Sequence, residues 1–218
     1  MQKKCFISLD KYTTVVVANG EMPTHPLAMD ALKNAQNIVC CDGAFHSLRK
    51  LGILPTVIVG DGDSLSQEDI RNFAHLYVPD KSTEYNDLTK AFHICRKNCW
   101  KEVVVLGATG LREDHALANL SILMNLEEGF HVVAVSNYGV FTPIARTTIF
   151  DSFEGQPVSV FSFTPETEIT FKGLRYPVQN RQFKHFWEGS LNVSLGEYFT
   201  VSFDDGKLLV YQAFKNQI

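Results

Sequence analysis

Two carboxylates stand one residue apart, directly after a short apolar run. Residues 56–59 end at Gly60 in a pattern typical of a buried strand, and Asp61, Asp63 and Ser64 follow it. Open α/β sheets bind their ligands at the carboxyl ends of strands. Adjacent carboxylates repel one another unless a cation lies between them. The stretch therefore predicts a Mg²⁺ site, with a solvated acidic turn as the alternative.

Further polar residues follow other predicted strands or open predicted helices: Asp42, Gly43, Asn86, Asp87, Gly107, Arg112 and Asp114. Carboxylates, an arginine and glycine turns at one sheet edge fit a Mg²⁺-bound polyphosphate, because arginine can hold a phosphate through two hydrogen bonds. The segment 107–110 is too short for a P-loop and lacks the lysine, and no such loop occurs elsewhere. This excludes a P-loop kinase.

The elements that must position these residues alternate along the first part of the chain. Apolar runs predict strands at 13–18, 37–41, 56–60, 76–78, 102–106 and 131–135. Helical patterns lie between them, at 28–35, at 45–51, after Ser66, after Asn86 and from Arg112 to Met124. Alternating strands and helices predict an α/β domain with a mostly parallel sheet, which we expect over residues 1–145. Its loops should converge at one edge.

The pattern changes in the last third of the chain. Short strand-like runs at 158–163, 168–171, 197–203 and 207–214 are separated by turn residues, and no long helix is evident. The triplet 204–206, Asp-Asp-Gly, predicts a hairpin between the last two runs. We expect a smaller antiparallel β domain over residues 146–218, either a sandwich or an open barrel.

Composition narrows the class of protein. The chain has 218 residues, a formal charge of −4 and a sequence pI near 6.0, and its basic residues are dispersed, so we expect no nucleic-acid partner. No apolar segment is long enough to span a membrane, and the first five residues lack the apolar core of a signal peptide. These features predict a cytoplasmic protein.

The cysteines are odd in number and favour reduced thiols over a disulfide framework. Cys95 and Cys99 lie one helical turn apart and close to His93, but no second ligand pair at zinc spacing follows, so we do not expect a zinc site. The full set is Cys5, Cys40, Cys41, Cys95 and Cys99.

Four blocks, at 41–44, 60–64, 86–91 and 112–115, resemble in order and spacing the signature motifs of the thiamine pyrophosphokinase family. The residues at 173–177 and 201–210 also resemble the C-terminal β domain of that family. Each block alone is a weak signal, whereas four in order, followed by a second domain of the right kind, make a specific one. The resemblance covers nearly the whole chain.

The resemblance implies a homodimer in which each chain has an α/β nucleotide-binding catalytic domain and a β-sandwich domain for thiamine binding and dimerisation. It also implies the transfer of a diphosphate from ATP to the hydroxyl of thiamine, with release of AMP. Mg²⁺ would be the cofactor and ATP the co-substrate, with no membrane partner. By this analogy catalysis depends mainly on positioning and electrostatics.

Residue roles follow from the resemblance where the motifs match. Asp61, Asp63 and Asp87 are expected to hold the metal, Arg112 to grip the transferring phosphoryl oxygens, and Asp114 to orient Arg112 or to help order the metal. One aspartate is expected to accept the hydroxyl proton, but the sequence does not say which. The nucleotide and phosphate set is Asp42, Gly43, Ser64, Asn86, Gly107 and Arg112. The thiamine set is Tyr176, Ser190 and Asn192.

The chain departs from the family pattern at two places. Asn86 stands where the family usually has threonine, and 189–192 reads Gly-Ser-Leu-Asn where the family has Gly-x-Ser-Asn, so the serine is either displaced by one position or absent. Tyr176 replaces an aromatic that stacks on thiamine in some relatives, with a core position as the alternative. We expect Phe183, Phe186 and Trp187 to be in the core or a dimer interface, and His115 to pack at a helix start.

Two other activities remain open on the residues alone. A phosphatase can carry Asp-x-Asp after a strand and use the first aspartate as nucleophile. That motif normally lies on the opening strand, whereas here two predicted strands precede the strand that ends before Asp61. A non-catalytic nucleotide or thiamine sensor could keep the fold for binding. The several carboxylates argue against a sensor, because a pure anion binder has no need of them.

Overall fold

The computed structural model describes residues 7–215. These divide into two compact units: residues 9–137 form an α/β unit, and residues 138–215, with residues 7–8, form a β unit. The structure thus changes unit between Asn137 and Tyr138, before the boundary expected after residue 145. Cys5 and the N-terminal residues considered as a signal peptide lie outside the described residues.

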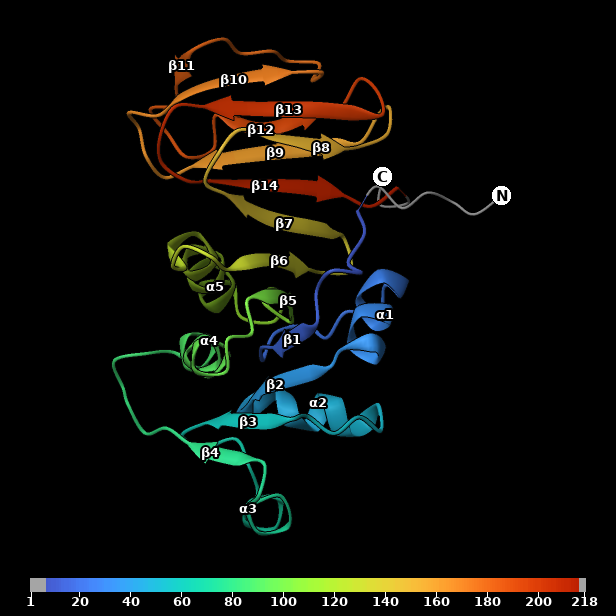
Figure 1. The fold of residues 1–218 in the computed structure, drawn as a ribbon, viewed down its shortest axis with the longest axis vertical. Coiled ribbons are helices and arrows are strands. Elements are labelled where there is room, and N and C mark those ends of the chain that lie inside the picture. The colour runs from blue at the N-terminus through green and yellow to red at the C-terminus, as the bar shows by residue number, and fades with distance from the viewer. Residues whose placement is uncertain (1–6, 216–218) are drawn as a thin grey trace. The chain divides into compact units, whose positions relative to one another are not determined.

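The α/β unit contains one parallel sheet with strand order β6-β5-β1-β2-β3-β4. Helices α1 and α2 lie on one face of this sheet, and α4 and α5 lie on the other (Figure 1). The mostly parallel α/β domain is confirmed. In chain order its elements are β1 (Thr14–Val17), α1 (Pro26–Asn34), β2 (Asn37–Cys41), a 3₁₀ turn (Asp42–Ala44), α2 (Phe45–Lys50), β3 (Val57–Gly60), α3 (Gln67–Asn72), β4 (Tyr77–Pro79), α4 (Asp87–Lys97), β5 (Glu102–Leu106), α5 (Glu113–Asn125) and β6 (His131–Val135).

The local sequence explains these elements. The central strands are runs of β-branched residues that are buried on both faces, such as Val15 to Val17 in β1, as parallel strands covered by helices require. Two helices begin after Ser66 and Asn86, as expected from the sequence, and these residues cap them: the Ser66 side chain accepts the backbone N–H of Asp69, and the Asn86 side chain accepts that of Thr89. Because these six strands are all parallel, their carboxyl ends lie at one edge of the sheet.

The sheet changes direction at β1. From β1 the chain adds β2, β3 and β4 on one side, and it then places β5 and β6 on the other. The chain leaves β1 for α1 on one face of the sheet and leaves β5 for α5 on the other face (Figure 1). In open α/β sheets this switch point is where ligands bind.

The β unit is a sandwich of two antiparallel sheets. Within the unit the strand orders are β12-β9-β14-β7 and β11-β10-β13-β8. Side chains from both sheets share one core, with Val160 and Leu208 from the first and Ile169 and Phe199 from the second. The sandwich implied by the family resemblance is confirmed. Its strands are β7 (Gly139–Ile144), β8 (Thr148–Asp151), β9 (Pro157–Ser162), β10 (Glu168–Lys172), β11 (Arg181–Gln182), β12 (Gly189–Val193), β13 (Tyr198–Phe203) and β14 (Leu208–Ala213).

The predicted hairpin at 204–206 is wrong. β13 pairs with β10 and β8, whereas β14 pairs with β7 and β9, so the turn passes from one sheet to the other. The turn is held by β10 and the residue before it: Glu168 N donates to Asp204 Oδ1 at 3.0 Å, and Thr167 Oγ1 donates to the Asp205 carbonyl at 3.0 Å. Asp-Asp-Gly correctly marks a chain reversal, but turn residues do not determine which strands pair afterwards.

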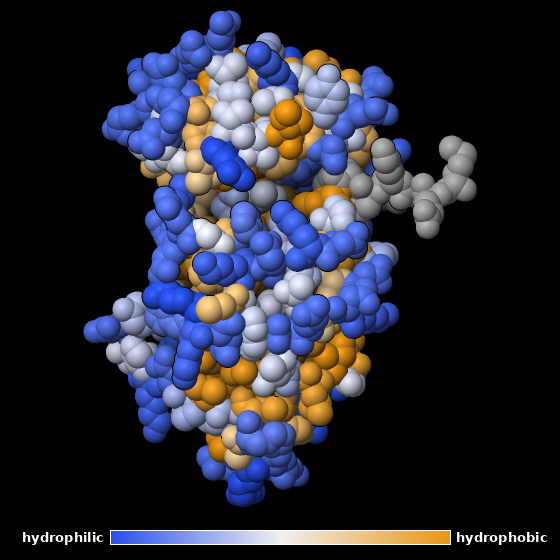
Figure 2. All heavy atoms as spheres, in the orientation of Figure 1, coloured by the Kyte–Doolittle hydropathy of each residue, from blue (hydrophilic) through white to orange (hydrophobic). Residues whose placement is uncertain are grey.

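The face of the molecule seen in Figure 2 is largely polar, with apolar surface around α2 and β3. Leu51 and Leu54, in the connection between these two elements, are 44% and 60% exposed. Among the described residues, no helix has both the length and the apolar character needed to cross a bilayer.

Candidate active site

Three carboxylates meet at the carboxyl ends of two neighbouring strands. Asp42 follows β2, and Asp61 and Asp63 follow β3, which pairs with β2. One oxygen from each carboxylate lies within 4.8 Å of the other two. The structure thus brings together residues that are about twenty positions apart in the chain, and the predicted pair Asp61 and Asp63 gains Asp42 as a third member.

Backbone N–H groups hold the Asp42 carboxylate. Asp42 is 1% exposed; its Oδ1 accepts from Gly43 N at 2.6 Å and its Oδ2 from Gly62 N at 2.8 Å. Gly60 and Gly62 make this approach possible, because a Cβ on Gly60 would overlap the Asp42 carboxyl group and Gly62 has a φ of +84°. The glycines therefore wrap the end of β3 around a buried carboxylate.

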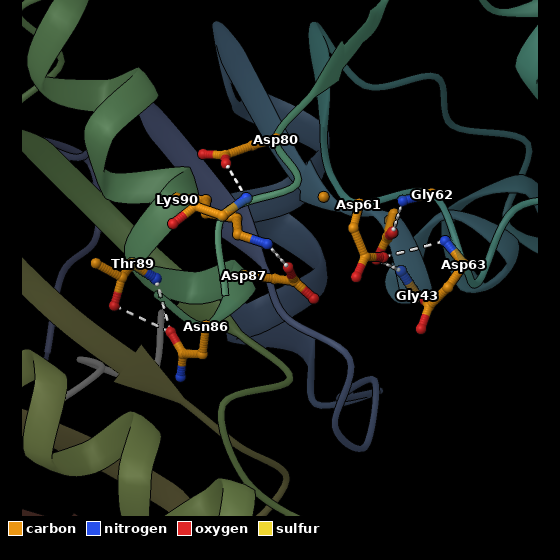
Figure 3. A network of polar contacts seen from close by, with 12 residues as sticks. Gly43, Asp61, Gly62, Asp63, Asp80, Asn86, Asp87, Thr89 and Lys90 are labelled. Carbon is orange, nitrogen blue, oxygen red and sulfur yellow. Dashed lines mark hydrogen bonds and ion pairs between the residues drawn. The ribbon is translucent and has the colours of Figure 1, made fainter. Parts of the chain in front are cut away.

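Asp61 and Asp63 are exposed beside this buried acid. Asp61 Oδ1 accepts from Asp63 N at 3.1 Å, and Asp63 Oδ1 accepts the Ser64 hydroxyl at 2.9 Å, so each is braced locally (Figure 3). Both line a surface pocket of about 560 Å³, which is within the size range of small-molecule sites. Its other lining residues are Gly62, Gln67, Ile70, Tyr77, Pro79 and Lys81.

The electrostatics of the group favour a cation. Burial raises the pKa of Asp42, and the charges of Asp87 and Asp61 raise it further, against the lowering effect of the Gly62 and Gly43 hydrogen bonds. A divalent cation would relieve this repulsion. The donor set consists entirely of carboxylate oxygens, the ligands that Mg²⁺ prefers. The residues present therefore fit the metal that the family resemblance implies.

The start of α4 carries a second charged pair. Asp87 is not one of the three grouped carboxylates; its Oδ1 instead accepts from Lys90 Nζ at 3.1 Å (Figure 3). Lys90 is 4% exposed, and burial alone would lower its pKa, but the hydrogen bond to Asp87 and the charges of Asp87, Asp80 and Asp61 raise it overall. A buried, charged ammonium group thus lies among the acids.

Sequence reasoning did not select Lys90 for the site, although it lies within the matched block at 86–91. A signal for it was present: Lys90 is the one charged residue between Leu88 and Cys95 on the apolar stretch of α4. A lysine on a buried helix face must be paired, and Asp87 lies one turn before it.

Arg112 and Asp114 form a pair at the start of α5. Arg112 Nε donates to Asp114 Oδ1 at 2.9 Å and its Nη2 donates to Oδ2 at 2.6 Å, and both side chains are exposed. The hydrogen bonds from Arg112 hold the pKa of Asp114 well below its usual range. α5 follows β5, and β1 lies between β5 and β2, so at about 4.8 Å per strand the ends of β5 and β2 are roughly 10 Å apart along the edge.

The loop after β5 meets the end of β1 at the switch point. Gly20 N donates to the Gly107 carbonyl at 2.8 Å, and Glu21 N donates to the Thr109 carbonyl at 2.9 Å. A Cβ on Gly107, where φ is +66°, would overlap the Ala18 carbonyl oxygen. Gly107 therefore allows two loops to pack together at the edge where the sheet changes direction.

The predicted thiamine residues belong to the β unit. Tyr176 is 61% exposed, which excludes the alternative of a core tyrosine. Asn192 lies buried and hydrogen-bonds the backbone at Tyr176: its Oδ1 accepts from Tyr176 N at 3.0 Å, and its Nδ2 donates to the Tyr176 carbonyl at 2.8 Å. Ser190 is half-buried, in a segment of β12 whose register shifts between Gly189 and Asn192. Between these two positions β12 has one more residue than its partner β9, as in a β-bulge.

The aromatic residues near this segment divide into two groups. Phe183 is 1% exposed and contributes to the sandwich core, as one of the two expected alternatives. Phe186 and Trp187 are 50% and 58% exposed, and Phe186 lies about 6 Å from the ring centroids of Phe161 and Phe163. His115 is exposed at the start of α5.

Comparisons with known proteins place the chain in a family. The family model for "Thiamin pyrophosphokinase, catalytic domain" matches residues 28–134, and the model for "Thiamin pyrophosphokinase, substrate-binding domain" matches residues 139–211. Thiamin pyrophosphokinase 1 of Caenorhabditis elegans is 27% identical over 180 residues, which cover 74% of this chain and 73% of that protein. Thiamine pyrophosphokinase of Bacillus subtilis is 24% identical over 144 residues, covering 62% and 66%.

Solved structures share the fold. The thiamine pyrophosphokinase from Bacillus subtilis superposes with a TM-score of 0.77 at 19% identity, covering 93% of this chain and 99% of its own. The Candida albicans thiamin pyrophosphokinase gives a TM-score of 0.77 at 18% identity, covering 92% and 89%. Because the two family models together match most of the chain, and do so in the two units that the structure separates, the chain belongs to the thiamin pyrophosphokinase family.

Proposed function

We propose that this protein transfers a diphosphate from ATP to the hydroxyl of thiamine, giving thiamine diphosphate and AMP. The observation that carries the proposal is the group formed by Asp42, Asp61 and Asp63 at the strand ends of the α/β unit, next to the Asp87–Lys90 pair. A polyphosphate donor needs oxygen ligands for its metal and cations for its own oxygens, and this edge offers both. Family membership identifies the substrates.

The exposed acids Asp61 and Asp63 would hold Mg²⁺, with Asp42 behind them and Asp87 completing the set expected from the sequence. When bound, Mg²⁺ would neutralise phosphate oxygens and the charge that develops on the departing AMP. Asp42 is fixed by two backbone N–H groups, so it can hold the positions of its neighbours. We assign to it a supporting role as well as the nucleotide contact expected from the sequence, shared with Gly43 and Ser64.

In the reaction, the thiamine hydroxyl oxygen forms a bond to the β-phosphorus of ATP. The bond between that phosphorus and the oxygen bridging to the α-phosphorus breaks, and AMP leaves with the bridging oxygen. The hydroxyl proton passes to one of the exposed carboxylates, Asp61, Asp63 or Asp87. Lys90 and Arg112 hold phosphate oxygens, with Arg112 oriented through its two hydrogen bonds to Asp114.

Tyr176, Ser190 and Asn192 form the proposed thiamine set. The exposed Tyr176 ring can stack on a cationic heterocycle, and Asn192 fixes the backbone that carries this ring. We also propose a homodimer that functions in the cytoplasm. The exposed aromatic residues Phe163, Phe186 and Trp187 support a dimer surface on the β unit, because aromatic side chains are enriched in the cores of interfaces.

The test is an assay of purified protein with ATP, MgCl₂ and thiamine, in which AMP and thiamine diphosphate are separated by chromatography. Equal amounts of the two products are expected, and none without thiamine. Nucleotide binding without AMP would favour a sensor, and phosphorylated Asp61 in acid-quenched protein would favour a phosphatase. Light scattering of the same sample tests the dimer.

A further inference from the structure

Asn119 is a buried polar residue that the proposed mechanism does not use. It lies on α5, is 8% exposed, and its side-chain amide hydrogen-bonds two separate parts of the α/β unit. Its Nδ2 donates to the Ala108 carbonyl at 2.9 Å, and its Oδ1 accepts from Asn86 Nδ2 at 3.4 Å. A buried amide paired on both sides in this way usually maintains a particular arrangement of its neighbours.

Backbone groups at both ends determine how the two amides are oriented. The Ala108 carbonyl can only accept, so Asn119 must turn its NH₂ group toward Ala108 and its oxygen toward Asn86. At the other end the Thr89 N–H can only donate, so Asn86 turns its oxygen to Thr89, at 2.9 Å, and its NH₂ group to Asn119. Each hydrogen bond in this chain therefore has a fixed donor and acceptor. The chain runs from the Thr89 N–H through Asn86 and Asn119 to the Ala108 carbonyl, and we call it the relay.

Both ends of this relay lie next to groups of the proposed site. At one end, Asn86 caps α4 and is followed by Asp87 and, one turn later, Lys90. At the other end, Ala108 belongs to the loop that hydrogen-bonds Gly20 and Glu21 at the switch point and leads into Arg112. A shift between α4 and this loop would therefore move the Asp87–Lys90 pair relative to Arg112.

We propose that Asn119 is a positioning residue for diphosphate transfer, holding the start of α4 and the loop after β5 at a fixed separation through its side-chain amide. This inference rests on the proposed function. Asn119 does not contact the reacting atoms in this role; it acts through Asp87, Lys90 and Arg112. Misplacement of such groups by about 1 Å can reduce turnover about a hundredfold.

The experiment compares N119A with N125A. Asn125 is the matched control, since it also lies on α5 and its Nδ2 donates to a backbone carbonyl, that of Ser121 in the preceding turn, but it does not join two segments. N119A is expected to lower kcat about tenfold or more, while the KM values for ATP and thiamine change less than about threefold, because substrates still bind to groups that are poorly aligned. N125A should keep kcat within about twofold.

Hydrogen exchange measures the relay without the reaction. In N119A, peptides that cover 84–91 and 107–112 should exchange about fivefold faster than in N125A, because both segments lose a link to α5. N119D separates the two halves: its oxygens can still accept from Asn86 but repel the Ala108 carbonyl, so 107–112 should lose protection while 84–91 keeps it.

The outcomes distinguish this proposal from the proposed function. If wild-type protein makes AMP and N119A matches N125A in kcat, the positioning role is overturned, whatever the melting temperatures. If N119A loses kcat without faster exchange in either segment, the relay is overturned as the cause. If wild-type protein makes no AMP, the diphosphate-transfer assignment fails, and the exchange data alone decide whether the relay exists.

Discussion

Asp61 and Asp63 of the α/β unit and Asn192 of the β unit use their side-chain polar atoms in opposite ways. Asp61 and Asp63 are exposed and each makes one local hydrogen bond, so most of their acceptor capacity faces a pocket. Asn192 is buried, and its amide bonds the Tyr176 N–H, the Tyr176 carbonyl and the Val193 N–H. All three residues were expected at the site from the sequence, but their environments suggest different roles.

Asp61 and Asp63 have free acceptor atoms that can bind a ligand, whereas Asn192 holds the backbone that carries a proposed ligand-binding residue, Tyr176. Carboxylates held close together without a counter-charge are unfavourable for folding, and such an arrangement is typical of a site that binds a cation. An amide whose hydrogen bonds all go to backbone stabilises a loop. We therefore expect substitutions in the first region to affect turnover more than stability, and substitutions at Asn192 to do the reverse.

The largest effect on turnover is expected for D61N. Asparagine keeps an oxygen for the Asp63 N–H but removes one charge from the group, so kcat/KM should fall at least a hundredfold, or about 2.7 kcal/mol of barrier. Without divalent cation the variant should melt about 1–3 °C higher, because repulsion with Asp42 and Asp63 is relieved. Steady-state kinetics and calorimetry in EDTA measure both.

The control for this variant is E84Q, which removes an exposed carboxylate outside the group. It should leave kcat/KM within about twofold of wild type. A loss below about tenfold in D61N would contradict the role given to Asp61.

The β unit should show the opposite behaviour when N192A is compared with Y176A. N192A removes a buried side chain and its three hydrogen bonds to the backbone, and it should cost about 2–4 kcal/mol, lowering the melting temperature by roughly 6–12 °C. Y176A removes an exposed ring and should change the melting temperature by less than about 2 °C, while KM for thiamine rises about tenfold. Thermal melts and thiamine titrations at saturating ATP separate the two.

If instead N192A melts like wild type and Y176A has a lowered melting temperature, Asn192 is not the residue that stabilises this loop, and Tyr176 has a structural role. Y198A provides the matched aromatic control, because Tyr198 is 66% exposed on the same unit. It should leave KM for thiamine within about twofold of wild type.

The smallest effect on melting temperature is expected for D114N, which tests the exposed Arg112–Asp114 pair. The pKa of Asp114 is lowered from 3.8, so the carboxylate stabilises the folded protein above that pH, and this contribution is lost as the pH falls through the lower, folded-state value. The difference in melting temperature between wild type and D114N should therefore be small and constant from pH 5 to 8 and disappear in strong acid. A difference that grows on acidification would contradict the pairing.

Much of the α/β unit could be predicted because local signals and global structure agree there. β-branched runs gave the strands, and Ser66 and Asn86 gave two helix starts, since caps depend on neighbours three residues away. The convergence of Asp42 with Asp61 and Asp63 could also be expected, because parallel strands deliver their loops to one edge.

The remaining features depend on contacts that no local pattern encodes. Lys90 and Asn119 are polar residues on buried helix faces, and their value to the site depends on Asp87, Asn86 and Ala108, which the fold brings to them. The prediction that β13 and β14 form a hairpin was wrong for the same reason. A turn triplet reports a reversal of direction, whereas the partner strand is chosen by side chains elsewhere in the sandwich.

The position of β14 has a consequence for how the protein is made. β14 pairs with β9 on one side and β7 on the other, although both are synthesised long before it. Until β14 leaves the ribosome, those two strands present open edges that can pair with other chains. The α/β unit, whose strands all precede residue 136, can fold during that interval. A nascent chain that stalls before Leu208 would thus combine a folded α/β half with an aggregation-prone half, which makes the last strand a point of vulnerability in biosynthesis.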